Sequence, residues 1–160
     1  MAQVTLRKQN PADIAYYSVW WHDKDLIAVT SGDFTPLTQE VIDTYFTDMI
    51  NAKNQAHYMI ECDDETIGDI TLVEKSDALH ELQIIIGNHA YQNKGYGTQA
   101  IEQILAIAKT NGAKQVELFV RPDNARAIRV YQKTGFTQVG DVIETHNPLK
   151  PQLLRMVTDL

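Results

Sequence analysis

The chain has 160 residues and a formal net charge of -7, and 44% of its residues are hydrophobic. This length fits one compact domain, so we expect a single domain over residues 1–160. The acidic balance and the lack of clustered Lys and Arg argue against nucleic-acid binding, and no apolar run approaches the roughly 20 residues that span a membrane.

Residues 1–10 lack the apolar core of a signal peptide, and Cys62 has no partner cysteine in the chain. Both observations favour a reducing, cytoplasmic location. The histidines show no metal-ligand spacing, so we expect no metal site. The acidic surface would suit a cationic substrate, although a modest acidic excess commonly serves only solubility.

In the N-terminal third, residues 4–7 predict a short strand. Asn10 and Pro11 then form a favourable helix start, which predicts a helix over residues 11–20. The periodicity disappears between residues 22 and 35, and Thr35 or Thr38 can cap a second amphipathic helix. We expect these two helices to form one wall of a substrate site.

The middle of the chain predicts an antiparallel meander, with strands over residues 57–63, 66–74 and 80–87. An amphipathic helix follows over residues 98–111, where Gly112 is placed to end it. This helix has the clearest apolar pattern in the chain.

The C-terminal third predicts a strand over residues 116–120, a helix over 124–134 and two final strands over about 137–143 and 152–158. The order of elements is mixed α/β. No internal repeat or linker is evident.

Residues 92–98, with the sequence Gln-Asn-Lys-Gly-Tyr-Gly-Thr, lie between a predicted strand and a predicted helix. Backbone N–H groups there can converge on an anion at the positive end of the helix. Gly95 and Gly97 allow a ligand to approach the main chain closely, and Lys94 adds a positive charge. An ordinary tight strand-to-helix turn is the alternative interpretation.

The spacing of this loop excludes two other phosphate-binding motifs. A Walker A loop requires Gly, four residues, Gly, Lys and then Ser or Thr, and the dinucleotide fingerprint requires Gly-x-Gly-x-x-Gly. Ala100 stands where the third glycine would be, which the dinucleotide fingerprint sometimes allows, but the preceding strands form a meander and no βαβ unit opens the chain.

Two motifs together resemble the GNAT superfamily of N-acetyltransferases. The first is Gln-x-x-Gly-x-Gly, matched by Gln92, Gly95 and Gly97. The second is matched by Asn124, Ala127, Tyr131, Gly135 and Phe136. The resemblance is strongest over about residues 80–140. It implies an α/β GNAT-like fold, with a mostly antiparallel twisted sheet of six to seven strands and about four flanking helices.

The same resemblance implies acetyl-CoA as cosubstrate and a strand around residues 84–86 that offers main-chain groups to its pantetheine arm. The side chains of these three residues are expected to be plain sheet core. The residues implied to hold the cofactor are Ile84, Ile85, Ile86, Gln92, Asn93, Lys94, Gly95, Tyr96, Gly97, Thr98, Asn124, Ile128 and Lys133.

For the reaction, the resemblance implies Tyr131 as the general acid for the departing thiolate and Glu81 as the general base. A tyrosine packed in the core and a solvated glutamate at a strand start are the alternatives. No serine has a glycine-flanked elbow, and acids flank Cys62, so we expect direct attack of a primary amine rather than a covalent acyl-enzyme.

The acceptor amine is left open by the sequence. Trp20, Trp21, Asp23 and Asp25 can line an amine pocket, because aromatic faces and carboxylates attract ammonium groups; the tryptophans can equally anchor the first helix in the core. Residues 81–86 look similar to bacterial spermidine N-acetyltransferases. The connection over residues 86–92 looks closer to ribosomal-protein N-terminal and aminoglycoside acetyltransferases.

The expected function is acetyl transfer from acetyl-CoA to a primary amine of a small molecule or a protein N-terminus. A non-catalytic acyl-CoA sensor is the main alternative, and a phosphate- or nucleotide-binding protein that uses the loop at residues 92–98 is a second. Dimers are common among similar proteins, so we also expect a homodimer.

Overall fold

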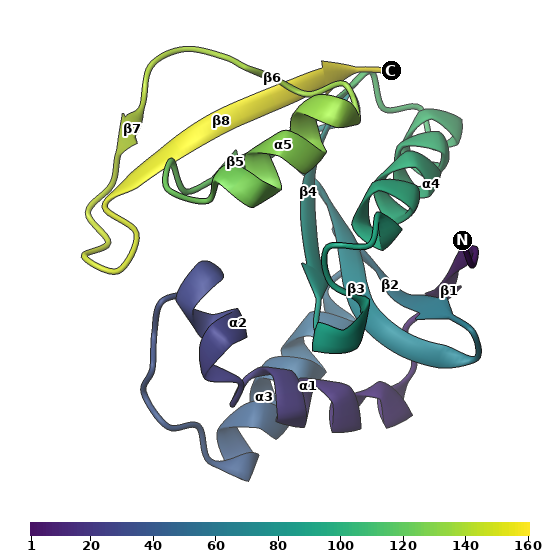
Figure 1. Cartoon of the computed structure of the whole chain (residues 1–160), viewed down its shortest axis with the longest axis vertical. Coiled ribbons are helices and arrows are strands. Elements are labelled where there is room, and N and C mark those ends of the chain that lie inside the picture. The colour runs from purple at the N-terminus through teal and green to yellow at the C-terminus, as the bar shows by residue number, and fades with distance from the viewer.

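A mixed sheet forms the centre of the molecule, which a computed structural model describes over residues 1–160 (Figure 1). Its strands are β1 (Val4–Lys8), β2 (Gln55–Cys62), β3 (Glu65–Glu74), β4 (Leu79–Ile86), β5 (Gln115–Val120), β6 (Thr137–Gln138), β7 (Ile143–Glu144) and β8 (Gln152–Asp159). The order across the sheet is β1-β2-β3-β4-β5-β8-β6, and β7 pairs with β8 off this path. Every pair is antiparallel except β4 with β5.

The helices flank this sheet on both faces. They are η1 (Pro11–Asp13), α1 (Ile14–Trp20), α2 (Lys24–Val29), α3 (Gln39–Asn51), η2 (His89–Tyr91), α4 (Tyr96–Thr110) and α5 (Ala125–Lys133). Local capping explains where several of them begin. Asn10 caps η1, with Pro11 at its first position, and Thr38 caps α3 by accepting from the Val41 N–H.

Two apolar clusters lie on the two faces of the sheet. On one face, α4 buries Ile101, Ile104 and Ala108 against strand residues such as Ile70. On the other face, Tyr17 and Trp20 of α1 and Phe46 of α3 pack over Met59 in a smaller cluster. Each fully buried isoleucine contributes on the order of 1.5 to 3 kcal/mol, so the α4 cluster is the main stabilising core.

The predicted mixed α/β fold with a mostly antiparallel sheet is confirmed, and the counts of elements are corrected. The sheet has eight strands because the segment expected as one strand over residues 137–143 forms two short strands that each pair with β8. The additional helix is α2, whose six residues are too few to show an apolar period.

Candidate active site

The pairing between β4 and β5 ends early, and this defines the centre of the site. Their parallel register covers only residues 79–81 of β4 opposite residues 115–117 of β5. Beyond Glu81, β4 continues to Ile86 with β3 paired along its other edge, while β5 diverges from it (Figure 1). The edge of β4 that faces β5 therefore offers unpaired main-chain groups, which can hydrogen-bond an extended ligand.

The N-terminus of α4 lies directly after this open edge. The backbone N–H groups of residues 93–98 donate to no carbonyl and no side chain of the protein. Gly95 caps the helix with a φ of 85°, a left-handed conformation that favours glycine. Unpaired N–H groups and the positive end of the helix dipole can together bind an anion such as phosphate.

The side chains of this loop have separate tasks. Gln92 donates from Nε2 to the Ile86 carbonyl over 2.8 Å, which folds the loop onto the end of β4. Tyr96 is buried at 9% exposure beside Tyr91, so it can offer a ligand only its backbone. A Cβ at Gly97 would meet only the Ile86 side chain, at 3.9 Å. Packing within the protein thus does not require glycine at position 97, whereas close approach of an outside group would.

The remaining loop residues fit the same interpretation. Asn93 has a φ of 61° and turns the chain ahead of Gly95. Lys94 is exposed and forms no ion pair, so its ammonium is available to an anion. Thr98 is half-buried in the first turn of α4.

The three isoleucines of β4 divide between the two cores. Ile84 and Ile86 pack against the cluster under α4, and Ile85 packs against the cluster under α1 and α3. Their side chains are sheet core, as the sequence predicted. Only their main-chain groups face the open edge.

Tyr131 stands on α5 with its hydroxyl free of hydrogen bonds to the protein, and its ring packs edge-on to Phe136 at 6.0 Å between centroids. Burial raises the pKa of Tyr131 to about 12. The phenol is therefore protonated at neutral pH, which is the state that a proton donor to a thiolate needs.

Three further residues expected at the cofactor lie on α5 or at its N-terminal cap. Asn124 caps the helix by accepting from the Ala127 N–H over 3.2 Å, which leaves its NH₂ group free to donate. Ile128 packs against the main core. Lys133 is exposed in the last turn, where a cation also favours the helix dipole.

Glu81 is the last β4 residue paired with β5, at the point where the two strands separate. Its carboxylate accepts from Lys75 Nζ and from Gln83 Nε2, each over 3.2 Å. The predicted general base is therefore already hydrogen-bonded to a cation and to an amide of the protein.

The two tryptophans of the expected amine wall differ in exposure. Trp20 is 6% exposed and lies against Gly87, where a Cβ would fall 2.2 Å from its indole. Trp21 is half-buried, with its ring 5.2 Å from Tyr17 and 6.3 Å from Tyr45. Trp20 therefore fixes α1 on the end of β4, and Trp21 is the more available of the two.

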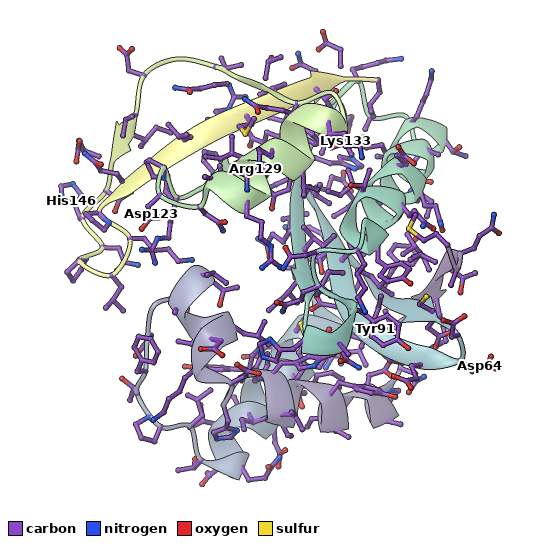
Figure 2. All side chains as sticks on the ribbon, viewed as in Figure 1. Asp64, Tyr91, Asp123, Arg129, Lys133 and His146 are labelled. Carbon is purple, nitrogen blue, oxygen red and sulfur yellow. The ribbon has the colours of Figure 1, made fainter.

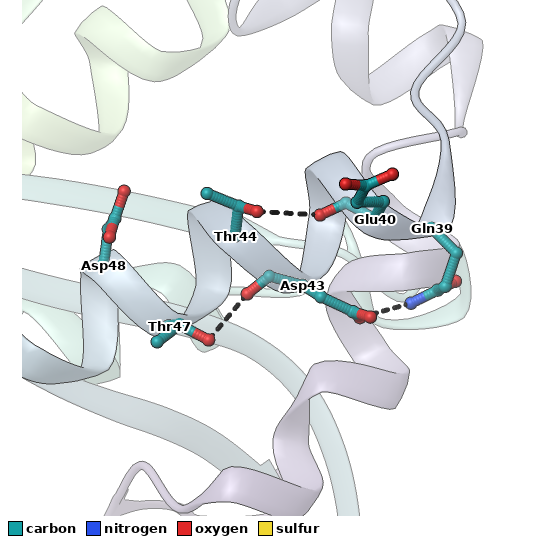
Figure 3. Close-up of a pocket in the computed structure, with 6 residues that line it drawn as sticks. All are labelled: Gln39, Glu40, Asp43, Thr44, Thr47 and Asp48. Atoms are coloured by element: carbon teal, nitrogen blue, oxygen red, sulfur yellow. Dashed lines mark hydrogen bonds between the residues drawn. The ribbon is translucent and has the colours of Figure 1, made fainter.

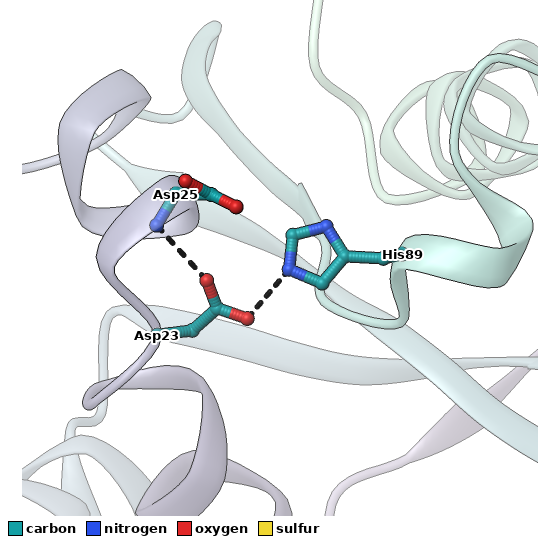
Figure 4. Close-up of side chains that lie close together, drawn as sticks. All are labelled: Asp23, Asp25 and His89. Carbon is teal, nitrogen blue, oxygen red and sulfur yellow. Dashed lines mark hydrogen bonds and ion pairs between the residues drawn. The ribbon is translucent and has the colours of Figure 1, made fainter.

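Asp23, at the start of α2, contacts His89 of η2, the turn that precedes the loop at residues 92–98 (Figure 4). Its carboxylate caps α2 through the N–H groups of Asp25 and Leu26, and His89 Nε2 lies 2.6 Å from its other oxygen. Desolvation opposes ionisation, but the hydrogen bonds from His89 and the helix outweigh it and lower the pKa of Asp23. Asp25 is exposed beside this pair, and the ligand atoms of all three side chains lie within 4.8 Å of one another.

His89, Arg121 and Arg129 are residues that the sequence did not single out. His89 is 66 positions from Asp23, and no local pattern signals the pair. Arg121 donates from Nη1 to the Ala28 carbonyl over 2.9 Å, which ties the end of β5 to α2. Arg129 extends from α5 toward the side of the molecule that carries α1 and α2 (Figure 2), and it forms no ion pair.

A shallow hollow on the exposed side of α3 lies away from these groups (Figure 3). It is lined only by side chains of that helix and carries no hydrophobic residue. Thr44 and Thr47 donate to carbonyls one turn earlier, and Gln39 donates to Asp43. This is a solvated helix face and adds nothing to the site.

The chain belongs to the acetyltransferase (GNAT) domain family, which it matches over residues 3–137. It is 32% identical to the spermidine N(1)-acetyltransferase of Escherichia coli strain K12 over 97 residues, 59% of this chain and 52% of that one. It is 35% identical to the mycothiol acetyltransferase of Corynebacterium efficiens over 74 residues, 46% of this chain and 25% of that one. The chain thus spans between a quarter and three fifths of the length of the first curated relatives that it matches.

Solved structures show the same fold at lower identity. Spermidine N-acetyltransferase from Vibrio cholerae, in complex with CoA and spermine, superposes with a TM-score of 0.85 at 21% identity, over 98% of this chain and 95% of that one. The aminoglycoside acetyltransferase AAC(6')-Ib, in complex with coenzyme A, superposes with a TM-score of 0.82 at 21% identity over the same shares. No helix of the protein is long and apolar enough to cross a membrane.

Proposed function

We propose that this chain binds acetyl-CoA and transfers the acetyl group directly to a primary amine of a small molecule or a protein N-terminus. The observation that carries the proposal is the run of unpaired N–H groups at residues 93–98, next to the unpaired edge of β4. The pyrophosphate would lie on the first set of groups, and the amides of the pantetheine arm would extend along the second.

The residues around this path supply the remaining needs of the cofactor. Lys94 would add a cation beside the pyrophosphate, and the free NH₂ group of Asn124 would donate to a pantetheine carbonyl. Ile128 and Lys133 would contact the cofactor from α5 on its other side. The main chain of residues 84–86 completes the groups that would contact the cofactor.

Tyr131 is the proposed proton donor. In the reaction the amine nitrogen attacks the thioester carbonyl, the C–N bond forms and the C–S bond breaks. The departing sulfur has a pKa near 8.5 as a free thiol, so it can take the Tyr131 proton as charge develops on it. The proton lost from the attacking nitrogen restores the phenol.

The acceptor must arrive at the site as a neutral amine. A primary amine has a pKa of about 10.4, so on the order of one molecule in a thousand is neutral at pH 7, equivalent to roughly 4 to 5 kcal/mol. Because the solved neighbours include a spermidine N-acetyltransferase with bound spermine and an aminoglycoside acetyltransferase, polycationic amines are the first acceptors to test. Asp23, Asp25 and Trp21 form the proposed wall for their ammonium groups.

The test is a thiol-release assay with acetyl-CoA against polyamines, aminoglycosides, amino acids and N-terminal peptides, comparing the wild type with Tyr131→Phe. Turnover on one amine class that falls sharply in the variant is the expected result. Tight CoA binding without thiol release on any amine would instead support the acyl-CoA sensor, and ATP affinity comparable with that for CoA would support a nucleotide-binding protein.

Two further parts of the proposal concern the setting of the protein. We propose a cytoplasmic location, in which the buried thiol of Cys62 stays reduced. We also propose a homodimer, which light scattering of the purified chain would test.

A further inference from the structure

Asp69 lies in the middle of the sheet beside the strand proposed to hold the cofactor. It stands in a row of cross-strand partners, with Arg7 on β1 opposite Met59 on β2, Met59 opposite Asp69 on β3, and Asp69 opposite Ile85 on β4. Side chains directly opposite each other have Cβ atoms about 4.5 to 5.5 Å apart. Its neighbours Met59 and Ile85 belong to the cluster under α1 and α3, so Asp69 faces the same side as the proposed amine wall.

No cation neutralises this carboxylate. Arg7 stands in the same row, but its guanidinium is already bound by Asp13 at 2.9 Å and by Glu61 at 2.6 Å. Asp69 takes part in none of the ion pairs of the protein. A carboxylate buried without a cation is costly, and such groups are concentrated at functional sites.

Tyr17 is the titratable group that contacts Asp69. The Tyr17 hydroxyl accepts from Gln9 Nε2 over 2.8 Å and lies 3.7 Å from the Met59 sulfur, which is a weak acceptor; its one proton can be donated to that sulfur or to the Asp69 carboxylate. Tyr17 is 3% exposed, whereas Asp69 keeps partial exposure. The carboxylate is thus held in place on one side and is accessible on another.

The other ionisable groups on this face of the sheet already have partners. His57 bonds Thr71 and Gln55, and burial lowers its pKa, so it is neutral at pH 7. The charged side chains around this face form ion pairs: Arg7 with Asp13 and Glu61, Lys75 with Glu81, and Arg155 with Glu117. Asp159, on β8, also lies on this face without a cation, but it is exposed and bonds Gln115. Asp69 is the half-buried carboxylate on this face without a cation. Burial raises its pKa to about 7, against a smaller opposing effect of the Tyr17 hydrogen bond.

From this arrangement we infer that Asp69, rather than Glu81, is the general base that removes the proton from the acceptor ammonium, directly or through one bridging water. The inference rests on the proposed function. The ammonium gives one proton to Asp69, and the neutral amine then attacks the thioester. The second nitrogen proton replaces the one that Tyr131 gives to the thiolate, and Asp69 releases its proton to solvent.

The test compares Asp69→Asn with Asp64→Asn across pH 5.5 to 9, using kcat/KM for an amine that the wild type acetylates. Asp64 is exposed at the tip of the β2–β3 hairpin (Figure 2), with a φ of 63° that Asn tolerates, so Asp64→Asn is a matched control. We expect kcat/KM of Asp69→Asn to fall by about 10² to 10³-fold. The acidic limb of the wild-type profile, near pH 7, should disappear, while KM for acetyl-CoA and the Asp64→Asn profile stay as in the wild type.

A second variant separates this role from a structural one. Tyr17→Phe removes a hydrogen bond that lowers the pKa of Asp69, so its acidic limb should move to higher pH. A purely structural role would reduce activity equally at every pH.

Three results would overturn the inference. The first is an Asp69→Asn profile that matches the wild type within twofold, and the second is an acidic limb that is lost in Glu81→Gln but kept in Asp69→Asn. The third is CoA binding by the wild type without turnover on any amine, which would refute the proposed function, and the assignment of a base with it.

Discussion

Replacing Asp69 with asparagine should stabilise the protein above neutral pH, although it is expected to impair the reaction. In the folded protein, burial raises the pKa of Asp69 from its ordinary value of 3.8 to about 7. At a pH between these two values, the Asp69 carboxyl is ionised in the unfolded chain and neutral in the folded protein. Stability contributed by the neutral carboxyl is thus fully present below about pH 4 and is lost as the pH rises through 7.

The size of the effect follows from the same two values. A pKa difference of one corresponds to about 1.4 kcal/mol, so the full difference sets an upper bound of about 4 kcal/mol. Because Asp69 keeps partial contact with solvent, we expect about 2 to 3 kcal/mol. Asparagine has nearly the same shape and can still accept from Tyr17, but it carries no charge.

Urea unfolding of the wild type and of Asp69→Asn, at pH 4 and at pH 8.5, measures this difference directly. The free energies of unfolding should agree at pH 4, and that of the variant should be higher at pH 8.5. Asp64→Asn, which changes an exposed turn, should follow the wild type at both pH values. Equal stabilities of wild type and Asp69→Asn at pH 8.5 would show that Asp69 carries no burial cost and would refute the reasoning.

Three further predictions concern the proposed site. Tyr131→Phe should lower kcat by about 10²-fold or more with little change in KM, measured by thiol release; an unchanged kcat would remove Tyr131 as the acid. Gly95→Ala forces a side chain into a φ of 85°, so thermal unfolding should show a loss of about 1 kcal/mol, together with a higher KM for acetyl-CoA. Asp23→Asn removes the negative partner of His89, so KM for a polycationic amine should rise several-fold; an unchanged KM would count against Asp23 as part of the amine wall.

Much of the fold could be predicted because the relevant signals are local. Thr38 caps α3, Gly95 ends the loop before α4, and the apolar period of residues 98–111 matches the buried stripe of α4. The motif around Gln92 and the motif around Tyr131 are each a single short segment of the sequence. Secondary structure and the conformation of the loop at residues 92–98 follow from such short-range patterns.

The residues that were missed depend on contacts between distant segments. Asp69 interrupts an apolar strand, which by itself suggests a residue facing solvent; its burial comes from the docking of α1 and Tyr17, more than fifty positions away. The bond between Asp23 and His89 has no local signal, because the two residues are 66 positions apart and no motif in the sequence joins them. The short helix α2 also formed without a period, through the cap that Asp23 provides.

The central claim is direct acetyl transfer by a site that binds acetyl-CoA between β4, the N-terminus of α4 and α5. Mass spectrometry of protein and amine, after incubation with acetyl-CoA, tests this claim most directly. The account predicts an amine that carries one acetyl group and a protein whose mass is unchanged, with or without the amine. An acetylated protein in the absence of amine would contradict direct transfer, and an unmodified amine beside bound, intact acetyl-CoA would contradict the enzyme itself.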